Sequence, residues 1–195
     1  MNELIILKQR FMENCKTESI NSFVIAVYKV ILEHENSDSD YWNEDHGSQD
    51  LIQIFENCFN LGDWKDLELD LKNWTNFQLE LFTQAILGGY LSYTNEGVYN
   101  SEKEIVKELT KTVPNRFDLL FPIIELEKER KLNSKDLSHI IIDYLDFIND
   151  HFDILIETDS NYIKKIKSIF LLLGLTESNS ENVLILKQKI QNASI

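Results

Sequence analysis

Glycine and proline are scarce in this chain, with 6 Gly and 2 Pro among 195 residues. The two together usually make up about 12% of a protein. Tight turns depend on them, because glycine tolerates positive φ and proline presets the turn geometry. The chain therefore cannot form many hairpin turns, which favours a few long helices over a many-stranded β protein. Hydrophobic residues make up 43% of the chain, enough for a sizeable core.

Three segments carry apolar residues at the i, i+3, i+4, i+7 spacing of an amphipathic helix: 20–31, 75–91 and 134–151. Thr75 and Gln78 have the spacing of a capping box, in which each side chain bonds the other residue's backbone N–H. These three segments are the strongest helix predictions.

Weaker helical patterns fill much of the remaining chain, and no segment alternates with the period of two that a half-buried strand needs. In the pattern at 115–131, Pro122 either kinks one helix or begins a new one. The sequence predicts an all-α fold: one domain, 1–195, of about ten helices in antiparallel hairpins, forming a HEAT-like stack or an orthogonal bundle. The weaker patterns lie at 2–15, 49–59, 64–73, 102–113, 115–131, 160–173 and 181–191.

The compartment is expected to be the cytoplasm. The apolar run Leu4–Leu7 is too short for a secretion signal, and every uncharged apolar stretch falls far below the roughly 20 residues of a membrane span. Cys15 and Cys58 stand beside apolar residues, which predicts buried free thiols rather than a disulfide.

The net charge of −14 opposes binding to nucleic acid or to an anionic membrane, because both depend on Lys and Arg. Most of this charge is local: residues 30–101 hold 14 acidic and 2 basic side chains. Carboxylates without compensating cations repel one another unless a cationic partner relieves them.

The acidic part includes a loop at 35–48 that contains two aromatic residues, and Trp64 follows soon after it. Two interpretations stay open. In the first, the tryptophans cover the core while the acids stay in water. In the second, the loop and neighbouring helix ends form an acidic and aromatic docking surface for a basic protein. The candidate docking residues are Glu35, Asp38, Asp40, Tyr41, Trp42, Glu44, Asp45, Asp63 and Trp64.

Signatures of nucleotide, zinc and common hydrolase sites are missing from the chain, so we expect no cofactor and no catalytic residues. One helix face carries a histidine and three carboxylates. It is either a solvated face or, in an enzyme alternative, part of a metal-dependent hydrolytic site. These residues are His139, Asp143, Asp146 and Asp150.

A small, acidic, helix-rich chain without catalytic motifs resembles the immunity proteins of bacterial polymorphic-toxin and contact-dependent inhibition systems. The resemblance covers size, charge and fold type rather than a motif. It implies a non-enzymatic protein that binds a cognate toxin domain, often a basic nuclease, and blocks its active site. A helical adaptor or regulator with another protein partner is the nearest alternative.

Overall fold

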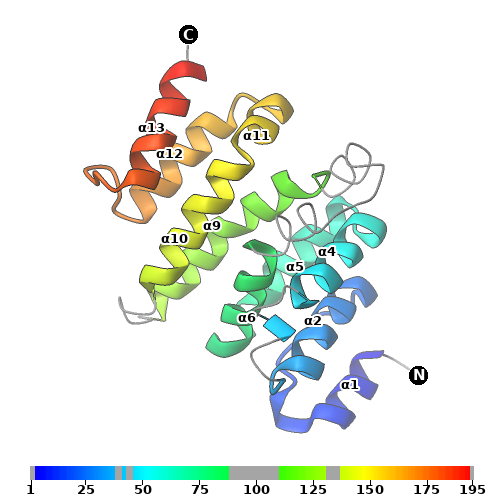
Figure 1. Cartoon of the computed structure of the whole chain (residues 1–195). Coiled ribbons are helices and arrows are strands. Elements are labelled where there is room, and N and C mark those ends of the chain that lie inside the picture. Colours follow the sequence, from blue (N-terminus) through cyan, green and yellow to red (C-terminus); the bar gives the residue numbers. More distant parts are fainter. Residues whose placement is uncertain (1–2, 38–40, 43–45, 88–109, 131–136, 194–195) are drawn as a thin grey trace. The chain divides into compact units, whose positions relative to one another are not determined.

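The computed structural model describes residues 3–37, 41–42, 46–87, 110–130 and 137–193 (Figure 1). These residues form ten α-helices and one short 3-10 helix, with no strand among them, which confirms the predicted all-α fold. The chain divides into unit 1, Met1–Thr112, and unit 2, Val113–Ile195, and each unit is described by itself. That the whole chain folds as one domain stays a prediction.

Unit 1 is built around α2, which packs against α1, α4, α5 and α6. Val24, Val27 and Ile31 on α2 are completely buried, as expected for a helix with neighbours on several sides. The elements of unit 1 are α1 (Glu3–Phe11), the 3-10 helix η1 (Met12–Asn14), α2 (Ser22–His34), α4 (His46–Cys58), α5 (Leu61–Leu71) and α6 (Asn76–Leu87).

Two of the strongest helix predictions lie in unit 1, and their capping residues set where the helices begin. Asn21 caps α2, since its Oδ1 accepts hydrogen bonds from the backbone N–H groups of Phe23 and Val24. Ile20 therefore precedes the helix and is 84% exposed, which corrects its expected place on the apolar stripe. The predicted capping box before α6 is confirmed by both of its hydrogen bonds, between Thr75 and Gln78.

Unit 2 contains the third strong prediction as α10, and its helix α9 runs through Pro122 without interruption. Most of the predicted helix at 102–113 lies outside the described residues. α11, which the sequence did not predict, packs against α9, α10 and α12, while α13 packs against α10. The helices are α9 (Val113–Glu129), α10 (Leu137–Asp150), α11 (Phe152–Thr158), α12 (Tyr162–Leu172) and α13 (Glu181–Ala193).

Lysines of unit 2 donate hydrogen bonds to carbonyl groups at helix ends. Lys128 Nζ donates to the carbonyl of Leu172 at the end of α12, and Lys189 Nζ donates to that of Asn149 at the end of α10. The last carbonyls of a helix have no partner within it and carry partial negative charge. These lysines therefore stabilise the ends of two helices of unit 2.

Among the described residues, none of the helices combines the length and apolar character that crossing a bilayer requires. Both cysteines are free thiols. Cys15 is buried as expected, and burial raises the pKa of its thiol. Cys58 is exposed at the end of α4, which corrects the prediction that it is buried.

His151 lies in the core of unit 2 between α10 and α11 and is 1% exposed. Its Nδ1 is 2.8 Å from the carbonyl oxygen of Phe147, and since a carbonyl can only accept, Nδ1 carries the proton. Burial lowers the pKa of His151 from 6.5 to about 4, and the positive charge of Arg116 acts in the same direction. The folded state therefore holds this imidazole neutral.

We expect His151 to make unit 2 sensitive to acid. Between pH 6.5 and about 4 the unfolded chain binds this proton before the folded chain does, so stability is lost as the pH falls. Between about pH 7 and about pH 4.5 the loss should be about 2–3 kcal/mol. His151→Phe removes this contribution. Amide hydrogen exchange of α10 and α11 measures this stability in the full chain. If the stability of the native protein and that of His151→Phe fell equally as the pH is lowered, the prediction would be wrong.

Candidate functional site

Five of the nine predicted docking residues fall within the described part of unit 1: Glu35, Tyr41, Trp42, Asp63 and Trp64. The other four, Asp38, Asp40, Glu44 and Asp45, lie outside the described residues. Of the five, Glu35 is half-buried, with Oε2 3.4 Å from the side-chain nitrogen of Gln78. The remaining four contribute to the packing of unit 1, as follows.

Trp42 is buried in unit 1, with 6% of its surface exposed. Its indole Nε1 donates to the carbonyl of His34 at 3.0 Å. A Cβ atom at Gly47 would lie 2.4 Å from the indole ring, so the ring can lie here only because that residue is a glycine. Tyr41 stacks on the His34 ring at 3.7 Å and donates to Asp50, and burial raises the pKa of its hydroxyl.

Trp64 and Asp63 also belong to the interior. Trp64 is 8% exposed and packs against Phe55 and Phe59, with ring centroids 4.7 and 4.9 Å away. Asp63 completes a capping box with Asn60 at the start of α5. The tryptophans thus cover the core, as the first interpretation of the sequence expected. Trp42, Asp63 and Trp64 are thus buried in this structure, and a docking role for them stays a prediction.

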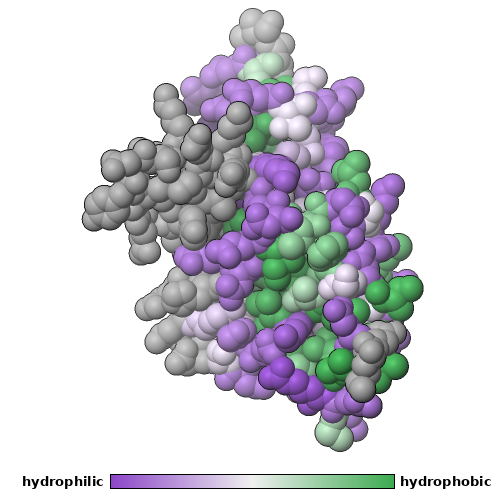
Figure 2. Space-filling model, turned by 90° about the vertical axis from the view of Figure 1, so that its right-hand side faces the viewer, coloured by the Kyte–Doolittle hydropathy of each residue, from purple (hydrophilic) through white to green (hydrophobic). Residues whose placement is uncertain are grey.

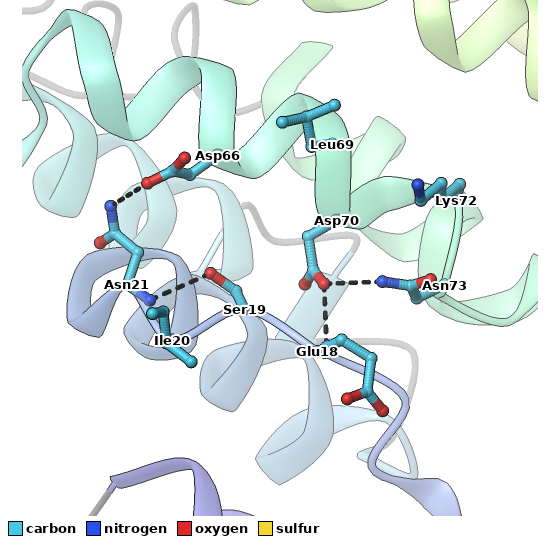
Figure 3. A pocket seen from close by; sticks show the side chains of 9 residues that line it. All are labelled: Glu18, Ser19, Ile20, Asn21, Asp66, Leu69, Asp70, Lys72 and Asn73. Carbon is cyan, nitrogen blue, oxygen red and sulfur yellow. Dashed lines mark hydrogen bonds between the residues drawn. The ribbon is translucent and has the colours of Figure 1, made fainter.

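A groove of about 550 Å³ lies instead between the chain segment that precedes α2 and the outer side of α5 (Figure 3). We call it the α5 groove. On its α5 side, Asp66 and Lys72 stand at opposite ends with Leu69 between them. Its full lining is Glu18, Ser19, Ile20, Asn21, Asp66, Leu69, Asp70, Lys72 and Asn73.

The two walls of the α5 groove are joined by the carboxylate of Asp70, which is 4% exposed. Its Oδ2 accepts from Thr17 Oγ1 at 2.5 Å and from the indole Nε1 of Trp74 at 2.9 Å. Its Oδ1 accepts from the backbone N–H of Glu18 at 2.9 Å and from Asn73 Nδ2 at 3.0 Å. Four donors replace the water that this buried carboxylate loses.

Asn21 makes the second connection between the walls. While its Oδ1 caps α2, its Nδ2 donates to Asp63 Oδ1 at 2.7 Å and to Asp66 Oδ2 at 2.8 Å. The other oxygen of Asp63 accepts from the backbone N–H of Asn60. One amide side chain thus links the start of α2 to the first turns of α5. Asp63 does not line the groove but holds Asn21, which does.

Three of the four carboxylates of α5, those of Asp63, Asp66 and Asp70, accept hydrogen bonds from neutral donors. In the stretches of chain that the structure describes, no Lys or Arg forms an ion pair with Asp63, Asp66, Glu68 or Asp70. Unit 1 as a whole contains 20 acidic and 9 basic residues, a net charge of −11, against −3 for unit 2. Among the described residues these four carboxylates are therefore not neutralised by ion pairs, and Lys72 is the basic residue in the lining of the α5 groove.

Large apolar side chains are also exposed on unit 1, and Figure 2 shows hydrophobic atoms gathered between hydrophilic ones on the face that it draws. Ile20 and Leu69 line the α5 groove and are 84% and 64% exposed. The other such residues of unit 1 are Ile5, Ile6, Met12, Phe23, Leu61 and Phe77.

The enzyme alternative gains no support from the residues that the structure describes. Asp143, Asp146 and Asp150 are exposed on α10, and Asp146 accepts a hydrogen bond from Asn182. The side chain of His139 lies outside the described residues. Within the described ranges, no three His, Cys, Asp or Glu side chains are grouped so that they could hold a metal ion.

Comparison of the chain with protein-family models, with curated protein sequences and with solved structures found no match.

The Asp70 network should be essential for the stability of unit 1. Asp70→Ala leaves four donors without their acceptor and should lower the free energy of unfolding by about 3 kcal/mol or more. Asp70→Asn should lose less, because the amide keeps one acceptor oxygen. Since all three tryptophans lie in unit 1, tryptophan fluorescence during denaturant unfolding measures this loss.

Glu68→Ala is the matched control for Asp70→Ala. Glu68 lies on the same helix, is exposed and has no hydrogen-bond partner within the described residues, so its replacement should change stability by less than about 0.5 kcal/mol. Equal effects of the two substitutions would show that the four hydrogen bonds to Asp70 contribute nothing net.

Proposed function

We propose that this protein is a non-enzymatic protein-binding module whose partner is a basic protein. The observation that supports the proposal is the excess of negative charge on unit 1, where Asp63, Asp66 and Asp70 of α5 accept hydrogen bonds from neutral donors. A net charge of −11 on one unit repels itself and does not stabilise the fold. A cationic partner would relieve the repulsion, and the same field would speed its approach.

The proposal extends to the kind of partner. With its size, acidity and helical architecture, the chain resembles bacterial immunity proteins, and we propose that it neutralises a cognate toxin domain in the cytoplasm. In this proposal, carboxylates of the protein take the place of nucleic-acid phosphates on a basic nuclease and block its active site. Two free thiols are consistent with a reducing compartment.

The sequence predicts a loop at 35–48, but residues 46–48 belong to α4 in the structure. The charged residues of this segment stay in the proposal, whereas its aromatic contacts change. Because Trp42 and Trp64 pack into unit 1, a partner would have to bind other apolar side chains. Exposed aliphatic residues on the same unit, among them Ile20 and Leu69, are available for that contact.

A toxin domain encoded beside this protein provides the test. Co-production of the protein should restore growth of a bacterial host that makes the toxin. Replacing Asp38, Asp40 and Glu44 by Lys should weaken binding about 10- to 100-fold at low salt, and the difference should shrink at high salt because salt screens surface charges. Titration calorimetry at two salt concentrations measures both effects.

The matched control places the same change of charge on unit 2, at the exposed residues Asp153, Glu157 and Glu177. This variant should keep full rescue and nearly full affinity. Unchanged affinity of the loop variant would exclude the loop as a docking surface. Failure of the native protein both to bind and to rescue would reject the immunity function and favour an adaptor with another partner.

A further inference from the structure

We infer that the α5 groove is the docking site for a cationic segment of the protein partner, one that carries a bulky apolar side chain next to Lys or Arg. This inference rests on the proposed function and adds the place and the type of segment. It combines three properties of the groove: fixed walls, exposed aliphatic side chains, and carboxylates with remaining acceptor capacity.

The walls are already held in place before any partner arrives. Asp70 fixes the backbone of Glu18 on one side, and Asn21 joins the start of α2 to Asp66 on the other, as Figure 3 shows. Binding to a surface that needs no rearrangement avoids part of the entropic cost of association. The groove can therefore hold a short segment that would bind a mobile surface only weakly.

The apolar contact would come from Ile20 and Leu69, which the chain leaves exposed beside a concave surface. Ile20 belongs to the segment before α2 and Leu69 to α5, so each wall of the groove offers one exposed aliphatic side chain. A groove of about 550 Å³ is within the usual range for sites that take small ligands or a few side chains. It is suited to one anchor residue and its neighbours.

The charge around the groove selects a cationic segment. Asp66 uses Oδ2 for Asn21, while its Oδ1 accepts no hydrogen bond from the described residues. Glu18 is paired with Lys8 at 2.8 Å, but this ion pair is exposed, contributes little and can exchange. Because Lys72 stands at the opposite end from Asp66, the Lys or Arg of the bound segment should face the Asp66 end.

A second copy of this chain fits the groove poorly. Each copy has a net charge of −14, so association would bring like charges together. The occupant that the charge favours is therefore a basic protein segment, and self-association becomes an outcome that the experiment can detect.

The test uses synthetic peptides of about 12 residues with one central Leu or Phe flanked by Arg, added to the isotope-labelled full chain. Amide chemical shifts should change around Ile20, Asn21, Leu69 and Asn73. Replacing the central apolar residue by Ala should weaken binding about tenfold, which corresponds to the loss of roughly two buried methylene groups. Replacing Arg by Glu should abolish binding.

Matched variants of the protein separate groove contacts from general attraction. Leu69→Ala and Asp66→Asn should each weaken the peptide about tenfold. Leu61→Ala and Glu68→Gln alter exposed residues of the same helix outside the groove and should change affinity less than about twofold. Asn at position 66 can still accept from Asn21, so this variant should keep the fold.

Three results would overturn the inference: no shift changes at about 1 mM peptide, shift changes confined to other surfaces, or equal losses in the groove and control variants. Self-association that Leu69→Ala abolishes would assign the groove to a second copy. If the toxin domain binds and only the loop variant weakens it, the proposed function stands and the groove inference fails. If peptides bind the groove but no basic partner is neutralised, the groove inference stands and the proposed function fails.

Discussion

Asp70 joins two parts of unit 1 that are far apart in the sequence: the segment before α2, and the end of α5 with the residues that follow it. Its buried carboxylate accepts hydrogen bonds from Thr17 and Glu18, from Asn73 and from Trp74. The segment before α2, the end of α5 and the tryptophan that follows it are thereby fixed against one another. A buried carboxylate without such donors would be strongly unfavourable. Burial of Asp70 therefore requires the segment that contains Thr17 and Glu18 to lie beside the end of α5.

The lysines of unit 2 and the carboxylates of α5 in unit 1 bind different kinds of groups. In unit 2, Lys128 and Lys189 bind the carbonyl ends of helices, so positive charge offsets helix dipoles within the fold. On α5 of unit 1, carboxylates bind amide, hydroxyl and indole donors, which satisfy their hydrogen bonding but leave the charge in place. The hydrogen bonds of these carboxylates are thus satisfied while their negative charge is not neutralised. In our proposal, this remaining charge attracts a cationic partner.

Local patterns in the sequence predicted most of the helices because an apolar stripe and a cap act within a few residues. Thr75 and Gln78 show this most clearly. The capping box of Asn60 and Asp63 has the same spacing, but the sequence alone does not distinguish a capping carboxylate from one that is available for docking. The burial of Trp42 depends on the space left at Gly47, and no pattern of apolar residues or caps reveals that the two residues must contact each other.

The α5 groove could not be predicted because residues far apart in the sequence form its walls: Asn21 and Asp66 are 45 positions apart. Its lining divides into two classes. Asn21 and Asp70 hold the walls through several hydrogen bonds each, so replacing them alters the fold. Ile20 and Leu69 are largely exposed, so they can be replaced at little cost to stability. Changes at these exposed residues can therefore alter which segment the groove accepts while its shape is kept.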